Sequence, residues 1–259
     1  MKRLHLFEFE DLESFPVWLR NYMTDFLQLI CNTFDVYETI MPIIEKGLNK
    51  SGGQQIIDLA SGGGGGWLKI SERLKDKFPE HKILMTDYYP NTSAFEKAKQ
   101  KSEHFDFYRG SVDARDVPPE LKGMRTQFLS LHHFKPHDAK AILQNAVDSN
   151  SVIGVFEITE RSLKGFMGVV FSPISVLLLT PLARPFSLMR LIFTYLIPLI
   201  PLFVLWDGIV SVLRTYTISE MEQMAKSINK HETYEWEIGK AIKGPGQILY
   251  LLGYPKDNV

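Results

Sequence analysis

The chain has 259 residues, of which 45% are hydrophobic and 23% are charged, and its formal net charge is −1. This composition is that of a globular protein and excludes an intrinsically disordered one. A near-neutral chain without a dominant basic block also lacks the field that draws proteins to phosphate backbones, so no nucleic-acid partner is expected.

The cysteine content and the N-terminal segment both bear on localisation. Cys31 is the only cysteine, so no disulfide forms within the chain, and a reducing compartment is expected. Acidic residues at positions 8, 10 and 11 interrupt the N-terminal apolar residues before a secretory signal could form. The chain is therefore predicted to be cytoplasmic and, where it meets a membrane, peripheral on the inner face.

Periodic patterns divide the first two thirds of the chain into helices and strands. Apolar residues at three- and four-residue steps predict helical structure over residues 12–48, within an N-terminal helical extension over 1–50, and Gly52-Gly53 ends this region. Strands are predicted at 56–59, 82–86, 106–110, 127–131 and 152–156, with helices between them, for example from Trp67 and over 93–102. This alternation predicts an α/β fold, a Rossmann-like and mostly parallel sheet with helices on both faces, over a core at 51–162. Ligands of such sheets bind beyond the carboxyl ends of the strands.

A run of five glycines, 62–66, lies between the first predicted strand and the following helix. Glycine permits positive φ and lets a ligand approach the backbone, and the helix N-terminus presents unpaired amides. A flexible linker is the alternative, but a linker is not expected to fit tightly between a strand and a helix. The run therefore predicts a nucleotide-binding loop.

Acidic residues follow the next two strands. Asp87 ends the second strand, about twenty residues beyond the glycines, where a carboxylate accepts hydrogen bonds from ribose hydroxyls. Asp113 follows the third strand and is a candidate acceptor for the amino group of adenine. Asp116, before Val117-Pro118, is instead predicted to form a turn.

These segments, in this order, resemble the class I family of S-adenosylmethionine (SAM)-dependent methyltransferases over residues 50–160. The family's first motif, an acid followed by glycines at alternate positions, maps onto Asp58, Ala60, Gly62 and Gly64, so that Ala60 replaces the first glycine. Residues 130–134 look like the fourth motif, which lines the methyl-transfer site. The resemblance implies a seven-stranded sheet with an antiparallel last strand, SAM as cofactor, and no metal. The implied cofactor-binding residues are Asp58, Ala60, Ser61, Gly62, Gly63, Gly64, Asp87, Tyr88, Ser111, Val112, Asp113 and Ser130.

Methyl transfer is an in-line displacement, so the protein has mainly to align the reactants and exclude water. A neutral imidazole can remove the proton of a hydroxyl, phenol or amine acceptor, and His132 and His133 follow the fourth strand. Each of the two is a candidate base, and packing or capping at the strand end is the alternative role. Glu157, at the end of the fifth strand, is predicted either to orient the acceptor or to pair with Arg161 or a nearby lysine.

A strongly apolar insertion is predicted at 163–213, in which Arg184 and Arg190 are the only charges between Gly165 and Trp206. Five prolines in this stretch predict a bent hairpin rather than two regular membrane spans. Three interpretations remain open: a buried cap on the sheet, a cap lining a pocket for an apolar acceptor, and a membrane anchor with both arginines near lipid phosphates. Residues 214–259 are predicted to complete the core with a helix over 219–228, capped by Ser219 and Glu222, and two strands around Gly244-Pro245-Gly246.

The sequence thus favours a SAM-dependent methyltransferase acting on a hydrophobic or lipid-like small molecule, with peripheral membrane contact as a further expectation. A non-catalytic SAM-binding or membrane-adaptor protein is the second hypothesis, because Ala60 departs from the motif. A nicotinamide-dependent oxidoreductase is the third, and the absence of an evident Tyr-x-x-x-Lys pair disfavours it. The acceptor atom and the oligomeric state stay open.

Overall fold

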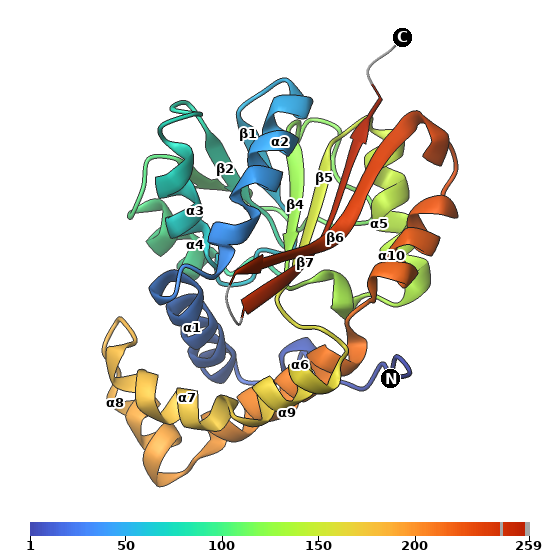
Figure 1. Ribbon diagram of the computed structural model, residues 1–259. Coiled ribbons are helices and arrows are strands. Elements are labelled where there is room, and N and C mark those ends of the chain that lie inside the picture. The colour runs from blue at the N-terminus through green and yellow to red at the C-terminus, as the bar shows by residue number, and fades with distance from the viewer. Residues whose placement is uncertain (244–245, 257–259) are drawn as a thin grey trace.

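The computed structural model describes residues 1–243 and 246–256. Its centre is one seven-stranded sheet with the order β3-β2-β1-β4-β5-β7-β6 (Figure 1). Strands β1 to β5 pair in parallel, and β7 is antiparallel to both β5 and β6. The predicted mostly parallel sheet is confirmed. The strands are β1 (Gln55–Asp58), β2 (Lys82–Met85), β3 (Phe105–Phe107), β4 (Met124–Phe128), β5 (Ile153–Glu157), β6 (Tyr234–Lys243) and β7 (Gly246–Pro255).

Helices cover both faces of the sheet (Figure 1). Successive residues of a strand point to opposite faces, and Ile56 and Ile57 of β1 accordingly enter two different cores. The Ile56 core includes α2 (Met41–Ser51), α3 (Trp67–Leu74) and α4 (Thr92–Lys99). The Ile57 core includes α5 (Pro136–Asp148) and α10 (Ile218–Lys226). Short helical turns connect these elements: η1 (Phe9–Asp11), η2 (Val36–Ile40), η3 (Leu131–His133), η4 (Thr180–Leu182), η5 (Ile192–Leu196) and η6 (His231–Thr233).

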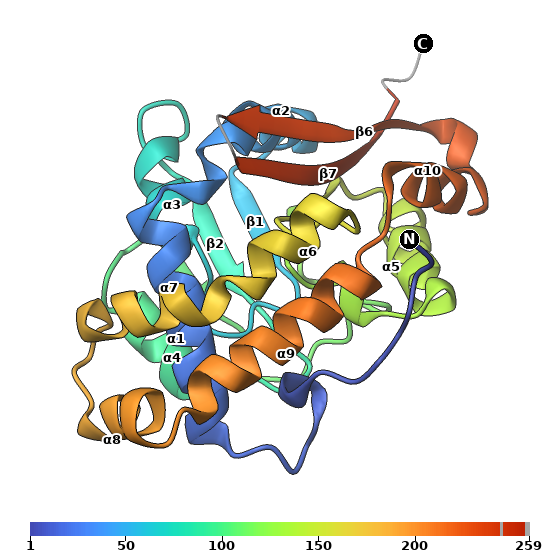
Figure 2. The same ribbon diagram turned by 60° about the horizontal axis from the view of Figure 1, so that its bottom comes forward.

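The insertion forms a separate layer of helices, which lies below the sheet in Figure 1. It consists of α6 (Leu163–Val170), α7 (Ser172–Leu179), α8 (Leu188–Leu191) and α9 (Leu199–Arg214). Helices α6 and α7 run beside α9, as Figure 2 shows. A third apolar core joins α7 and α9 to α1 (Val17–Thr33). Helix α1 thus connects the insertion to the rest of the fold.

By length and apolar composition, Leu163–Leu182 could span a membrane. Only 11% of its most apolar 18-residue stretch is buried inside the protein. Residues 188–196 and Leu199–Arg214 also qualify when taken together, but they are bent by 75° at the break. Pro198 stands at this break as the residue before α9. The proline-bent hairpin predicted from the sequence is present, although the first arm is less interrupted than its prolines suggested.

The N-terminal segment lies along α9. The amides of Phe9 and Glu10 donate to the two carboxylate oxygens of Asp207, at 2.8 and 3.2 Å. The indole of Trp206 donates to the carbonyl of Phe7 at 3.1 Å. Asp207 is the only acid of α9, and it is buried. Its hydrogen bonds to the N-terminal backbone compensate for the loss of hydration.

Several sequence predictions about element ends were wrong, and the third strand ends at Phe107, not at residue 110. The cap of α10 is Thr217 with Glu220, which form the reciprocal capping box, and Ser219 lies inside the first turn. The Ser/Thr-x-x-Glu spacing occurs twice, at Thr217–Glu220 and at Ser219–Glu222. Arg161 forms an ion pair with Glu220, the acid of the first of these motifs. The fourth strand ends at Phe128, not at residue 131, because the chain turns into η3 at Leu131. The turn predicted at Gly244-Pro245 lies outside the described residues.

Candidate functional site

A cavity of about 940 Å³ lies beyond the carboxyl ends of β1, β2 and β4. Its walls come from the loops after these strands, from the N-terminal segment and from α1. Of the predicted cofactor-binding residues, most line it: Asp58, Ala60, Ser61, Gly62, Gly63, Asp87, Tyr88, Val112, Asp113 and Ser130. Gly64 and Ser111 are not part of the lining. The fold therefore brings the separate motifs together at the expected edge of the sheet.

The glycine loop turns sharply between β1 and α3. Ala60, Gly62, Gly64 and Gly65 all have positive φ, from 44° to 86°. The amide of Ser61 donates to the carbonyl of Thr86 at 2.9 Å, which ties the loop to the end of β2. At Gly66 an added Cβ would lie 2.4 Å from the Tyr37 ring, so no larger residue fits there without displacing the ring. The run of glycines is thus explained by backbone conformation and by close packing.

The left-handed conformation of Ala60, with φ of 54°, gives a testable prediction. The left-handed region costs a non-glycine residue roughly 1–2 kcal/mol of conformational energy, a cost that glycine does not have. We expect Ala60→Gly to leave the unfolding free energy unchanged or raise it by up to about 1 kcal/mol, because relief of strain offsets the greater chain entropy of glycine. Ala60→Val, with a β-branched side chain, should lower it by at least about 1 kcal/mol. Denaturant unfolding of both variants measures the difference, and equal stability would contradict the strain.

Asp58 and Asp87 end adjacent strands and face the cavity with different surroundings. Asp58 is buried, its Oδ1 accepts from the hydroxyl of Thr126 at 2.9 Å, and burial raises its pKa to about 6. Asp87 accepts from the amides of Gly62 and Tyr89, both at 2.9 Å. Burial raises the pKa of Asp87 above its ordinary value despite these bonds. The Asp87 carboxylate is therefore held by the glycine loop itself, at the end of β2 where ribose is expected.

The Asp113 carboxylate is already paired. It accepts from the backbone amide of Arg115 at 2.9 Å and from its guanidinium at 2.7 to 3.1 Å. These bonds hold the pKa of Asp113 below its usual range. Ser111, outside the cavity lining, donates to the carbonyl of Tyr88 at 2.7 Å and so joins the second and third motifs. The role of Asp113 toward adenine stays a prediction.

His132 and His133 are neighbours in η3 but have different environments. His132 is buried, and its Nδ1 lies 2.8 Å from Oε2 of Glu157, while its backbone amide donates to Oε1 of Glu157 at 3.1 Å. Neither His132 nor Glu157 lines the cavity. Arg161 pairs with Glu220 rather than with Glu157, so the Glu157–Arg161 pair considered from the sequence was wrong. His133 does line the cavity, and its Nδ1 lies 2.7 Å from Oδ1 of Asp11.

Asp11 is fixed in turn by Arg214 at the end of α9. The buried guanidinium of Arg214 donates to Oδ2 of Asp11 at 2.6 Å and lies 3.4 Å from Oε1 of Glu8. Burial raises the pKa of Asp11, but the hydrogen bonds with His133 and Arg214 outweigh it and hold this pKa well below its usual range. Asp11 therefore stays ionised beside His133.

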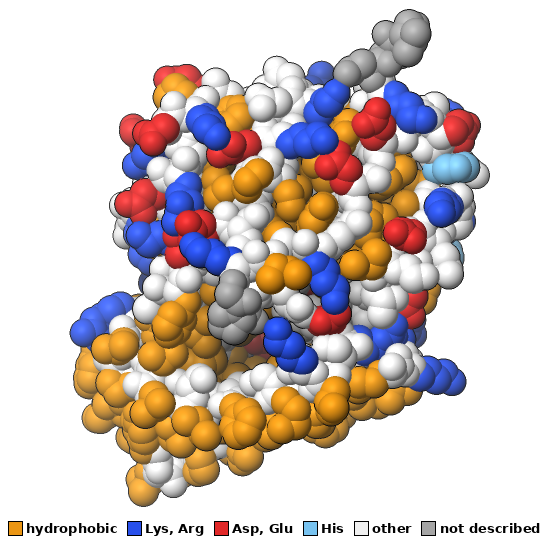
Figure 3. Space-filling model, viewed as in Figure 1, with side chains coloured by type: hydrophobic (Ala, Val, Ile, Leu, Met, Phe, Trp, Pro, Cys, Tyr) orange, Lys and Arg blue, Asp and Glu red, His pale blue; other side chains and the backbone are white. Residues whose placement is uncertain are grey.

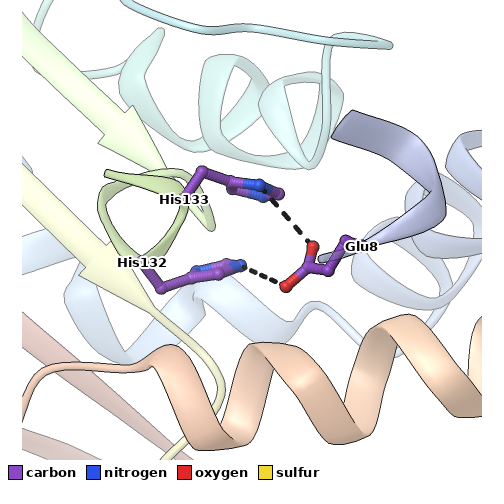
Figure 4. A group of neighbouring side chains, drawn as sticks. All are labelled: Glu8, His132 and His133. Carbon is purple, nitrogen blue, oxygen red and sulfur yellow. Dashed lines mark ion pairs between the residues drawn. The ribbon is translucent and has the colours of Figure 1, made fainter. Parts of the chain in front are cut away.

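Glu8, His132 and His133 point toward one another, with ligand-type atoms within 4.8 Å (Figure 4). Two imidazoles and a carboxylate form a donor set that divalent metals accept. The guanidinium of Arg214, however, already lies 3.4 Å from the Glu8 carboxylate, and Asp11 already contacts Nδ1 of His133. Burial raises the pKa of Glu8 to about 7, which weakens it further as a ligand. We therefore describe the cluster as a set of ionic contacts that hold the N-terminal segment against η3.

The contribution of the N-terminal region to the cavity was not predicted from the sequence. The wall on this side includes Glu10, Asp11, Glu13, Val17, Arg20, Asn21, Thr24, Leu27 and Gln28. Gln28 donates to the carbonyl of Gly63 at 3.1 Å, which joins α1 to the glycine loop. Only the unusual density of acids at residues 8–13 hinted at this role.

Comparisons with known proteins agree with the fold. No protein-family model matches the sequence, and no curated protein matches it. Among solved structures, human N-acetylserotonin methyltransferase in complex with SAM is 13% identical over 95% of this chain and 61% of its own, with a TM-score of 0.50. A putative O-methyltransferase from Nostoc punctiforme is 14% identical over 92% of this chain and 61% of its own, with a TM-score of 0.49. The chain spans about three fifths of the length of these two proteins.

This chain combines the strand order β3-β2-β1-β4-β5-β7-β6 with an antiparallel β7 and a glycine loop between β1 and α3. At an identity of 13%, the human structure shows a common fold alone. The chain has the class I SAM-dependent methyltransferase fold.

Proposed function

We propose that the protein is a SAM-dependent methyltransferase acting on a hydrophobic or lipid-like small molecule at a membrane surface. The observation that carries this proposal is that the glycine loop, Asp87 and His133 all line one cavity. The predicted nucleotide-binding loop and a candidate proton acceptor therefore face the same cavity. The SAM bound in the human structure supports the choice of cofactor.

The cavity residues fit the parts of SAM by chemical type. Asp87, Val112 and Asp113 line the cavity, and we assign Asp87 to the ribose hydroxyls and Val112 and Asp113 to adenine. The loop at Ser61–Gly63 lies against the cavity with little side-chain bulk, so that a ligand can approach its backbone. Bound SAM would supply an electrophilic methyl group. The protein's own task is then to position the acceptor and remove its proton.

His133 is the residue we assign to proton removal. Its Nδ1 lies 2.7 Å from Oδ1 of Asp11, and in the tautomer in which Nδ1 donates to this carboxylate, Nε2 would accept the proton of an acceptor hydroxyl or amine. Asp11 stabilises the imidazolium that results, since its carboxylate stays ionised. Val17, Leu27, Phe128 and Phe134 add apolar side chains to the same lining, which suits a hydrophobic acceptor.

Isothermal titration of the full chain with SAM and with NADH tests the cofactor, and we expect binding of SAM alone. Release of S-adenosylhomocysteine with prenols, quinols and phospholipids presented in vesicles tests the reaction. Binding of NADH without SAM would indicate an oxidoreductase and overturn the proposal. SAM binding without S-adenosylhomocysteine release, with any of these acceptors, would favour the adaptor hypothesis.

A further inference from the structure

The outer surface of the insertion is a continuous apolar face, which we call the apolar platform (residues 163–206). Figure 3 shows hydrophobic side chains covering this part of the molecule, whereas charged side chains are spread over the rest of the same view. Sixteen of the 28 exposed large hydrophobic residues in the described chain belong to it. They are Leu163, Met167, Val170, Phe171, Ile174, Leu177, Leu178, Leu182, Phe186, Leu188, Met189, Tyr195, Leu196, Ile197, Leu202 and Trp206. A soluble monomer rarely exposes so large a patch.

The opposite side of the same helices is buried against the fold. Val176 of α7 and Ile200 and Val204 of α9 are buried in the core that includes α1. Their neighbours Ile174, Leu178 and Leu202 are 54%, 71% and 56% exposed. Helices α7 and α9 thus each bury one apolar side against the protein. The other apolar side is left exposed, without a protein partner in the described chain.

The charges of the platform favour one partner. Residues 163–206 include no aspartate or glutamate, and their exposed charges are Lys164 and Arg184. Arg190 is buried and pairs with Asp25, so the prediction that it reaches lipid phosphates was wrong. A second copy of this face would oppose cation to cation, whereas an anionic lipid surface complements both the cations and the apolar side chains.

The packing also decides the orientation. Helices α7 and α9 contact α1 along one side, and Asp207 in the middle of α9 and Arg214 at its end bind the N-terminal segment. A helix that crossed a bilayer would have to leave these contacts. A helix that lies in the interface keeps them and immerses only its exposed side. Trp18, Tyr195 and Trp206 are partly exposed, and such side chains favour the headgroup level.

We propose that the apolar platform binds flat in one leaflet of an anionic lipid bilayer, without spanning it. The cavity then lies beside the membrane, because Val17 lines it while the adjacent Trp18 packs on Phe193 of the platform, with ring centroids 4.7 Å apart. An acceptor dissolved in the leaflet reaches the cavity along α1. Only this last consequence rests on the proposed methyltransferase function, and membrane binding stands without it.

Vesicle flotation of the full chain tests the proposal, with phosphatidylcholine vesicles that contain or lack 30 mol% phosphatidylglycerol. We expect the wild type to float with the anionic vesicles. Leu178→Glu/Leu196→Glu, at positions 71% and 77% exposed, should lower the bound fraction at least about tenfold. The matched control is Phe34→Glu/Ile242→Glu, at positions 62% and 68% exposed outside the platform, and it should float like the wild type. Both double variants should bind SAM as the wild type does, because none of the four positions lines the cavity.

Depth measurements separate lying flat from spanning. Single cysteines at Leu163, Phe171 and Leu178, each carrying a fluorophore, sample the length of the α6–α7 arm, and Cys31 is buried. Flat binding predicts equal quenching of all three by shallow spin-labelled lipids. Deep quenching at Phe171 alone would mean a span and overturn the orientation.

A wild type that stays out of vesicles, or that forms dimers which Leu178→Glu/Leu196→Glu dissociates, would overturn the membrane as partner. Loss of SAM binding in the wild type would contradict the proposed function and not the platform.

Discussion

His133→Ala is expected to lower the turnover of methyl transfer about a hundredfold or more while SAM affinity stays nearly unchanged. Of the residues of η3, His133 alone lines the cavity, and its Nδ1 contacts Asp11, so we assign proton removal to its other nitrogen. Rates of S-adenosylhomocysteine release at saturating SAM, together with titration of SAM, separate the two effects. Normal turnover in a folded His133→Ala variant would remove His133 from the role of base.

His132→Ala is the matched control, because it removes an imidazole from the adjacent position. The His132 imidazole contacts Oε2 of the buried Glu157, so its loss leaves that oxygen without its side-chain partner and should cost roughly 1–3 kcal/mol of stability. The turnover of the folded fraction should change far less than in His133→Ala. Thermal unfolding measures the first effect. If His132→Ala abolished turnover without loss of stability, the two roles would have to be exchanged.

Asp87→Ala is expected to weaken SAM binding by roughly 1.5–3 kcal/mol, about ten- to a hundredfold, through loss of charge-assisted hydrogen bonds to ribose. The variant also loses the acceptors of the Gly62 and Tyr89 amides, so part of the effect comes through the glycine loop. Asp87→Asn keeps an acceptor oxygen and should bind SAM with intermediate affinity. Isothermal titration measures all three proteins.

The control for Asp87 is Asp106→Ala. Asp106 lies on β3, pairs with Lys99 at the surface and does not line the cavity. Its removal should leave SAM affinity unchanged. If Asp87→Ala folds normally and binds SAM as tightly as Asp106→Ala does, Asp87 does not hold the ribose.

Local patterns in the sequence were sufficient to predict the sheet and most of the residues that line the cavity at its edge. The strand around Ile56-Ile57, the glycines after it and Asp87 at the end of the next strand follow from side-chain periodicity and turn chemistry, which act over a few residues. Parallel strands end at one edge, so Asp58 and Asp87 had to be neighbours once the alternation of strands and helices was recognised. The helix-capping motif occurs at both Thr217 and Ser219, and the sequence alone could not decide which residue caps α10.

Only the tertiary structure distinguished His132 from His133. The two residues share the same local sequence, and their difference comes from Asp11, which is 122 positions away, and from Glu157 on β5. Likewise, the apolar composition of residues 163–206 left a buried cap and a membrane anchor equally open. The packing of α1 on one side of α7 and α9 showed which apolar side chains remain exposed. Composition and periodicity record what a side chain prefers, but its actual neighbour depends on contacts between distant segments, and these exist only after the chain has folded.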